Sequence, residues 1–312
     1  FFCRGYLEWD RRVLKGIVEG GMQWGEKAVV ALSELGDLYE TARAYFTLAT
    51  CLGFWWFFIA EPEEQDRNRL KAIKYLNKAV DLSEKRGDTH LLGLSHFWWG
   101  LTTEEADEVG HFEKTLECGK LTRDNFLIAG GLDLLAYTTY WKASVTEDPE
   151  KKKELFEKAM QLYEKSQYHY SIISFKTPRY GLIGPPAGHA EHYFHVATFL
   201  ETDRKKRLEF LEKSEKAGIE ALKLAEDSDM PLVIATVLHV LSKTLEYRGR
   251  LEQDTAEKRS RLERALEYRE KTIEIFGQLT PFDYWDLGVM HNYLAGIKAE
   301  LADTQPDMDS KR

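Results

Sequence analysis

The 312-residue chain is predicted to be an all-α protein, an α-solenoid of about five to six antiparallel helix hairpins with long helices. The first observation behind this prediction is composition: 39 Leu and 25 Ala stand against 12 Val and 12 Ile, so strong helix formers far outnumber β-branched residues. The second is the scarcity of proline, with 8 residues, which leaves few forced helix ends. The third is a short pattern that recurs along the chain.

The recurring pattern is an apolar residue, then Glu or Asn, a basic residue, a small residue, and usually another apolar residue three positions later. Positions i, i+3 and i+6 lie along one face of a helix, and the small residue lets a neighbouring helix approach closely. Successive copies are 36, 44, 55 and 51 residues apart. The five copies are 76–82, 112–118, 156–162, 211–217 (a weaker copy) and 262–268.

Charged, loop-like entries are expected before four of these helices, at 62–68, 147–150, 202–203 and 254–255. Asp and Thr side chains in these entries are suitable N-caps, because their oxygens accept hydrogen bonds from the first free N–H groups of a helix. Pro149 suits the first helical turn, where its missing N–H is not needed.

More apolar helices are expected between the copies. Their predicted ranges are 37–60, 88–105, 124–146, 187–202, 230–248 and 282–302. With the first set, this makes eleven or twelve helices and no convincing strand. Because an amphipathic hairpin buries its apolar face only by stacking on neighbours, we predict a single domain over 1–302. A polar C-terminal tail follows at 303–312.

The segment from Ala72 to Leu82 resembles the second helix of a tetratricopeptide repeat (TPR), with Ala72, Leu76 and Ala79 at the matching spacing. The TPR repeat is about 34 residues long, so the longer steps here indicate a divergent, TPR-like relative with long helices. It is similar to repeat regions attached to signalling ATPases, cyclases or transcription regulators. The resemblance implies a scaffold or sensor that holds a peptide, a partner domain or a small ligand in a concave groove. It implies no catalytic residues.

Charge and cysteine content narrow the partners and the compartment. The net charge of −9 argues against a nucleic-acid partner. The uncharged segment 44–60 is 17 residues long, which favours a buried helix over a membrane-spanning one. Three cysteines without paired spacing predict a reducing, cytoplasmic location and no disulfide framework.

Three histidines, His189, His192 and His195, form the densest cluster of potential metal ligands. Residues three apart on a helix are neighbours, so two of them could chelate one metal, but all three cannot converge well. The alternative is that these side chains pack in the interior or hydrogen-bond to a ligand. We favour the alternative, predict no metal or cofactor, and place His189 and His192 in the binding surface.

The segment 176–189 is rich in glycine and proline and interrupts the repeat. One interpretation is a loop over the groove that helps to recognise a ligand, with Lys176, Arg179 and Tyr180 as contacts. The alternative is a plain connector. The glycine spacing matches no nucleotide-binding motif.

Adjacent aromatic residues recur in the apolar helices. Neighbours on a helix point about 100° apart, so one of each pair can pack in the core while the other lines a groove. The alternative is that all of them are core. On the first interpretation the groove contains Trp56, Trp99, Trp141 and Tyr193.

We therefore predict a non-enzymatic, helical-repeat interaction domain that recognises a protein or peptide partner in a concave aromatic-lined groove, as a regulatory scaffold within a larger protein. A small-molecule sensor with a pocket under the 176–189 loop is the alternative. A helical metalloenzyme built on the three histidines is the third hypothesis. No arrangement of nucleophile and base in the sequence favours enzymatic activity.

Overall fold

A computed structural model describes residues 11–58, 62–103, 108–173, 180–227, 231–279 and 284–304. These residues form twelve α-helices and one π-helical segment, and none of them is in a strand. The predicted all-α class is therefore confirmed. The chain divides into two compact units, Phe1–Pro178 and Arg179–Arg312.

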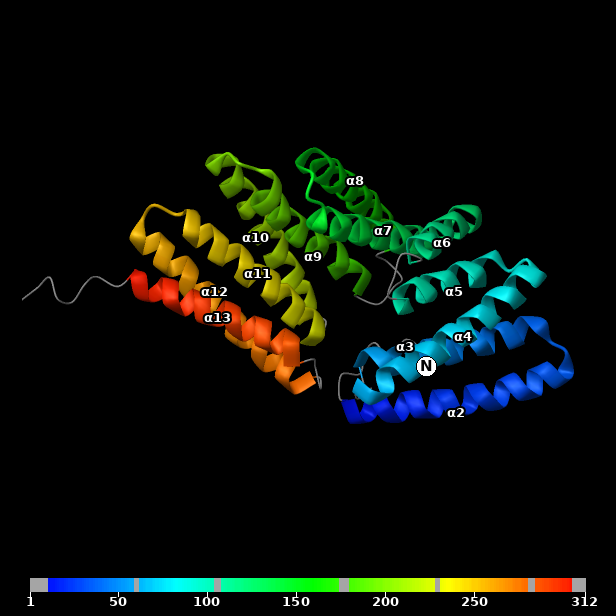
Figure 1. The fold of residues 1–312 in the computed structure, drawn as a ribbon. Coiled ribbons are helices and arrows are strands. Elements are labelled where there is room, and N and C mark those ends of the chain that lie inside the picture. The colour runs from blue at the N-terminus through cyan, green and yellow to red at the C-terminus, as the bar shows by residue number, and fades with distance from the viewer. Residues whose placement is uncertain are drawn as a thin grey trace, which may run out of the picture. The chain divides into compact units, whose positions relative to one another are not determined.

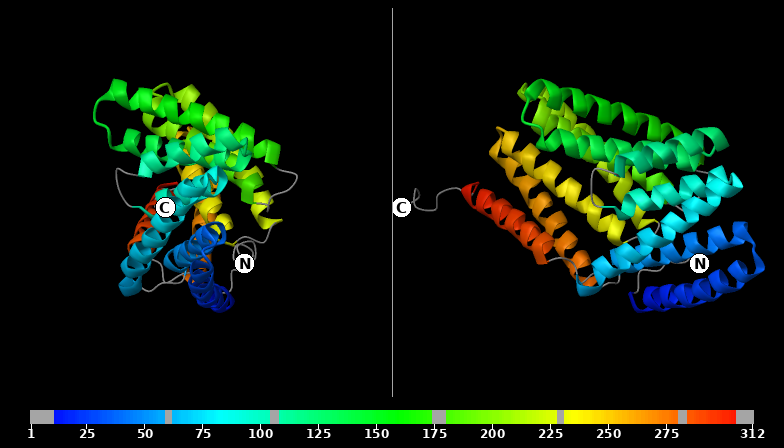
Figure 2. Two further views of the ribbon diagram at one scale, coloured as in Figure 1. Left: turned by 90° about the vertical axis from the view of Figure 1, so that its right-hand side faces the viewer. Right: turned by 45° about the vertical axis from the view of Figure 1, so that its right-hand side comes forward.

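Unit 1 is a stack of antiparallel helices in chain order (Figures 1 and 2). Each helix packs on the next, and contacts also join α3 to α5 and α5 to α7. This pattern of near-neighbour contacts is that of an α-solenoid. The helices are α2 (Arg11–Leu35), α3 (Leu38–Phe58), α4 (Pro62–Arg86), α5 (Thr89–Thr102), α6 (Glu108–Thr122), α7 (Asn125–Val145) and α8 (Pro149–Ile173).

Unit 2 has the same organisation, with each helix packed on the next and a further contact between α9 and α11. The π-helical segment η1 (Val196–Leu200) continues α9 directly. The helices are α9 (Tyr180–His195), α10 (Arg204–Glu226), α11 (Pro231–Leu251), α12 (Thr255–Leu279) and α13 (Tyr284–Asp303). Because helices in a solenoid contact only near neighbours, the division into units does not test the predicted single domain. Residues 305–312 of the predicted tail lie outside the described residues.

The recurring sequence pattern marks the buried contact face, here called the seam, of five helices. These are α4, α6, α8, α10 and α12. The apolar and the small residue of every copy are buried, with at most 2% of the surface exposed. The residue three positions later is buried only in the copy that has Cys118 there, and half-buried in the others. The seam residues are Leu76 and Ala79, Phe112 and Thr115, Phe156 and Ala159, Leu211 and Ser214, and Leu262 and Ala265.

Three turns in unit 1 share one local geometry. Each has a residue with positive φ, namely Gly36, Gly87 or Arg123, followed by an aspartate. The N–H of each aspartate donates to a carbonyl five residues earlier, which is the Schellman motif. The aspartates Asp37, Asp88 and Asp124 then accept N–H groups of the next helix. Each turn thus ends one helix and caps the next within two residues.

Predicted helix starts are confirmed where a cap is present. Asp203 accepts from Lys206 N at 2.9 Å and Asp254 accepts from Glu257 N at 2.9 Å. Pro149 is the first residue of α8. The loop predicted at 62–68 is wrong, because α4 begins at Pro62. A proline at the first helical position loses no hydrogen bond, so the charged residues after it belong to the helix.

The loop predicted at 176–189 is wrong from Tyr180 onwards, because α9 begins there and continues through Pro185 and Pro186. The glycines and prolines of this segment disfavour a helix locally. However, Pro186, Ala190 and Phe194 follow one another at four-residue spacing and are all buried. Packing of this face of α9 against α10 and α11 outweighs the local preference against a helix. Residues 176–179 lie outside the described residues.

Glycines set the spacing between α5, α6 and α7. A Cβ on Gly119 would lie 2.8 Å from the backbone nitrogen of Ile128, and one on Gly131 would lie 3.0 Å from that of Leu116. Backbone atoms cannot yield as a flexible side chain does, so these helices need glycine at both contacts. By contrast, a Cβ on Gly110 would meet nothing within 4 Å.

Substitution of two glycines on α6 should therefore have opposite effects on stability. Gly119→Ala should lower the free energy of unfolding by about 1–3 kcal/mol through overpacking. Gly110→Ala should raise it by about 0.5–1 kcal/mol through helix propensity. Urea unfolding followed by circular dichroism measures both. An equal effect of the two substitutions would contradict the close approach of α6 to α7.

Candidate functional site

The described aromatic pairs each split between the interior and a more exposed position. Trp98 is buried whereas Trp99 is half-buried. Phe194 is buried beside a half-buried Tyr193. The ring of Tyr140 packs 5.5 Å from that of Phe156, while the neighbouring Trp141 is exposed. In each of these pairs one residue is thus more exposed than its neighbour.

The outward residues of α7 form an exposed apolar stripe, defined as Tyr137, Trp141 and Val145. Their exposed fractions are 50%, 59% and 73%. The spacing of four residues places all three on one side of the helix. Scattered apolar residues are normal on a protein surface, but three large ones in a row on one helix face form a surface that could bind a partner.

Trp99 has a different environment from Trp141. Its indole stacks on the imidazole of His111 at 4.6 Å between ring centres and lies 6.2 Å from that of His96. The two imidazoles share a hydrogen bond, with their Nδ1 atoms 2.8 Å apart. Burial and the neighbouring His111 lower the pKa of His96 to about 4. Trp99 therefore holds α5 against α6 and contributes to packing.

The remaining residues of the predicted binding surface are divided between the two units or lie outside the description. The side chains of Trp56 and Tyr180 are not among the described ones, and Lys176 and Arg179 lie outside the described residues. Trp99 and Trp141 belong to unit 1, whereas His189, His192 and Tyr193 belong to unit 2. The predicted aromatic groove that would join them stays a prediction.

The histidines of α9 pack among aromatic rings. His189 and His192 lie 5.8 and 5.7 Å from the ring of Tyr193. His195 stacks on Phe199 at 5.7 Å. Burial lowers the pKa of His192 to about 4 and that of His195 to about 3, so both are neutral at pH 7. These contacts agree with the interpretation of the cluster as packing residues.

Metal binding and membrane insertion are two alternatives that the sequence raises. No three His, Cys, Asp or Glu side chains of the described residues are grouped so that they could hold a metal ion. Within the described helices, none combines the length and the apolar character needed to cross a membrane.

Unit 2 contains a group of charged side chains in its interior, which the sequence reasoning did not single out. Arg269 on α12 is fully buried, and its Nη1 donates to Nδ1 of His239 on α11 at 2.5 Å. Lys243, one turn after His239, has its ammonium 5.2 Å from the ring centre of Phe194. Burial lowers the pKa values of Arg269, to about 10, and of Lys243. The repeated pattern could have singled out Arg269, which lies seven residues after Leu262 in the fifth copy, whereas no local signal separates Lys243 from a surface cation.

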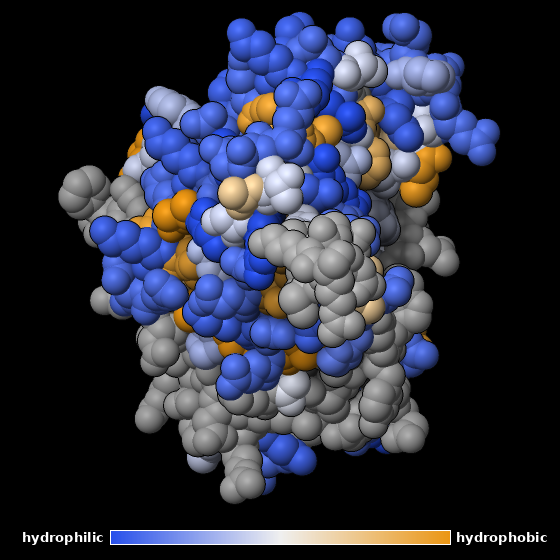
Figure 3. Space-filling view, turned by 90° about the vertical axis from the view of Figure 1, so that its left-hand side faces the viewer, coloured by the Kyte–Doolittle hydropathy of each residue, from blue (hydrophilic) through white to orange (hydrophobic). Residues whose placement is uncertain are grey.

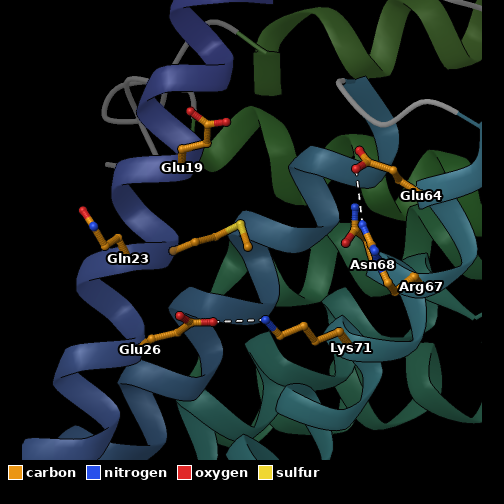
Figure 4. A pocket seen from close by; sticks show the side chains of 8 residues that line it. Glu19, Gln23, Glu26, Glu64, Arg67, Asn68 and Lys71 are labelled. Carbon is orange, nitrogen blue, oxygen red and sulfur yellow. Dashed lines mark hydrogen bonds and ion pairs between the residues drawn. The ribbon is translucent and has the colours of Figure 1, made fainter.

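A polar groove of about 460 Å³ lies between α2 and α4 (Figure 4). An ion pair between Lys71 and Glu26 at 3.0 Å joins the two helices across it, and Arg67 pairs with Glu64 on α4. Asn68, with 9% of its surface exposed, has no hydrogen bond from its side chain among the described residues. The lining is Glu19, Met22, Gln23, Glu26, Glu64, Arg67, Asn68 and Lys71. Seven of these eight residues are charged or carry an amide, so the groove offers hydrogen bonds and charge to a ligand.

The face drawn in Figure 3 is mainly hydrophilic, and its hydrophobic residues form small, separate patches. A broad apolar surface is therefore absent from the described residues of that face. This agrees with the high content of charged residues, 30% of the chain.

The neutral state of His195 predicts that unit 2 loses stability in acid. The pKa of His195 is about 3 in the folded chain and about 6.5 in the unfolded chain. The contribution of His195 to the free energy of unfolding is therefore present above pH 6.5 and is lost as pH falls towards 3. His195→Phe, which keeps an aromatic ring, should reduce the loss of unfolding free energy between pH 7 and pH 5 by about 2 kcal/mol. Urea unfolding at each pH measures this.

His90→Phe serves as the control, because a hydrogen bond to Asp124 raises the pKa of His90. The contribution of His90 is present below pH 6.5 and is lost as pH rises through its folded pKa, so the acid-induced loss should persist in that variant. An unchanged loss in His195→Phe would contradict a neutral, buried His195.

No protein-family model and no curated protein matches this chain. A solved structure described as a "circular tandem repeat protein with novel repeat topology and enhanced subunit contact surfaces" is similar over 95% of this chain and 80% of its own. The two sequences are 13% identical, and the TM-score is 0.34.

Proposed function

We propose that this chain is a non-enzymatic helical-repeat domain that binds a protein or peptide partner, and that the exposed stripe on α7 is its main contact. The observation that carries this proposal is the row of Tyr137, Trp141 and Val145 on one side of α7. Large aromatic side chains supply much of the binding energy of protein interfaces when a partner covers them.

The rigidity of the helix beneath the stripe supports this role. The opposite side of α7 is closely packed, with Leu132, Ala136 and Ala143 all buried. Tyr140 is fixed against Phe156 on α8. A side chain held on a rigid helix loses little conformational freedom on binding, so its contact area contributes more fully to affinity.

The stripe defines the chemistry of the partner. Its side chains offer apolar area together with the indole N–H of Trp141, so the partner presents aliphatic or aromatic side chains and a hydrogen-bond acceptor. An amphipathic helix with such residues at positions i, i+4 and i+8 matches the spacing of the stripe.

Trp141→Ala should weaken partner binding and leave stability unchanged. Peptides selected from a random display library against the wild-type chain should lose at least about 10-fold in affinity for this variant, as expected for a binding hot spot. The free energy of unfolding should change by less than about 0.5 kcal/mol, because the indole is 59% exposed. Fluorescence anisotropy and urea unfolding measure the two quantities.

Tyr168→Ala is the matched control, because Tyr168 is an exposed aromatic residue at the other end of the α7–α8 hairpin. Its neighbour His169 bonds to Asn125 at the start of α7, which is roughly 24 Å along the helix from Trp141. Peptide affinity should be kept in this variant. Selected peptides that bind Trp141→Ala as tightly as wild type would refute the proposed surface. Trp99→Ala should instead lower stability, since Trp99 packs against His111 and His96.

A further inference from the structure

Position 269 departs from the other copies of the repeated pattern. Seven residues after the first apolar residue of the pattern, the other four copies have Ser83, Gly119, Tyr163 and Gly218. A Cβ on Gly119 or Gly218 would lie within 3 Å of a neighbouring helix, so this position lies in the packed seam. In the fifth copy the same seam position holds the long, charged side chain of Arg269.

The guanidinium of Arg269 is only partly satisfied. The side chain is 0% exposed, and Nη1 donates to His239. Nε and Nη2 are buried and have no hydrogen-bond partner among the described residues. The guanidinium carbon lies 5.2 Å from the ring centre of Tyr293 on α13. A buried charge with unmade hydrogen bonds is costly, so these two donors need an explanation.

The acids near Arg269 are engaged elsewhere. Glu246 on α11 is the acid with the largest electrostatic effect on the pKa of Arg269, but Oε1 of Glu246 lies 2.6 Å from Nη2 of Arg250. Arg250 also pairs with Glu300 on α13. Within the part of the chain that the structure describes, no carboxylate lies within 4 Å of Arg269.

A second cation, Lys243, acts on Arg269 and has no ion pair within 4 Å among the described residues. The pKa of Lys243 is lowered mainly by burial. The positive charge of Arg269 lowers it further, so the two cations repel each other. Glu191 on α9 opposes this shift but forms no ion pair with Lys243 within 4 Å among the described residues. The buried Arg269 and the half-buried Lys243 thus lie in one region, and neither forms an ion pair within 4 Å with an acid of the described residues.

We propose that unit 2 contains a binding site for a small carboxylate anion, built by Arg269 and Lys243 at the junction of α11, α12 and α13. The N–H groups of Nε and Nη2 lie on one edge of the guanidinium and point in parallel, which matches the two oxygens of a carboxylate. His239 accepts the N–H of Nη1 and orients the guanidinium. Lys243 supplies the second positive charge. This site is independent of the α7 surface in unit 1.

Access to the site involves α13. Nε and Nη2 are covered by protein atoms, so the anion enters by displacing part of that cover. Among the helices of unit 2, α13 packs on α12 and is tied to α11 by the ion pair between Arg250 and Glu300. Binding of the anion should therefore hold α13 in place, which couples a small ligand to the order of the last described helix.

The test measures the unfolding temperature in formate, acetate and succinate, with sodium chloride at matched ionic strength as the reference. The wild-type unfolding temperature should rise with the logarithm of carboxylate concentration, as for any ligand that binds the folded state. Arg269→Met should abolish this rise, and Lys243→Met should weaken the apparent affinity at least about 10-fold. Arg259→Met is the matched control, because Arg259 is an exposed cation on the same helix and should behave as wild type.

A direct readout covers the case in which Arg269→Met fails to fold. The side-chain Nε–H resonance of Arg269 in the wild-type chain should move on titration with acetate, and amides of α13 should exchange more slowly. Absence of any carboxylate effect on the wild type would overturn the proposal, as would an equal effect in Arg269→Met.

Discussion

The close approach of neighbouring helices at small seam residues is the constraint on which the rest of this structure depends. The short residues at these seams also carry hydroxyl groups that donate across the interface to backbone carbonyls, as Ser166 does to Ala129 and Ser214 does to Ala190. Such bonds form only when two helix backbones are near each other. Size and hydrogen bonding at the seam therefore act together to fix the spacing of the stack.

The seam determines which side chains remain for other purposes. Once one face of a helix is committed to a neighbour, a second aromatic residue next to a buried one must point elsewhere, because adjacent residues differ by about 100° in direction. In α7 this leaves Trp141 on the surface beside a buried face. In α5 the same geometry places Trp99 against His111, because α6 lies on that side. Equal sequence patterns thus produce a surface residue in one hairpin and a packing residue in another.

The two units use their interiors differently. In unit 1, a described core cluster brings together Val18, Leu76 and Trp98 and is stabilised by apolar packing. Unit 2 adds buried histidines and the pair Lys243 and Arg269, whose ionised forms are disfavoured by burial. Charges that lack partners lower stability unless they serve a ligand or a specific arrangement. The cations in unit 2 therefore support a ligand site there, whereas the apolar stripe of α7 supports a partner surface in unit 1.

By itself, the sequence determined the helical class, the buried residues of each repeated pattern, and the helix starts that Asp203, Asp254 and Pro149 mark. These properties depend on residues within one or two helical turns, so local spacing and capping are sufficient to predict them. Only the tertiary structure decided that α9 runs through Pro185 and Pro186, because burial of one helix face outweighs a local preference. It alone placed Arg269 beside His239 and away from any described carboxylate. Distances between residues on different helices depend on how the helices pack, and no local rule contains that information.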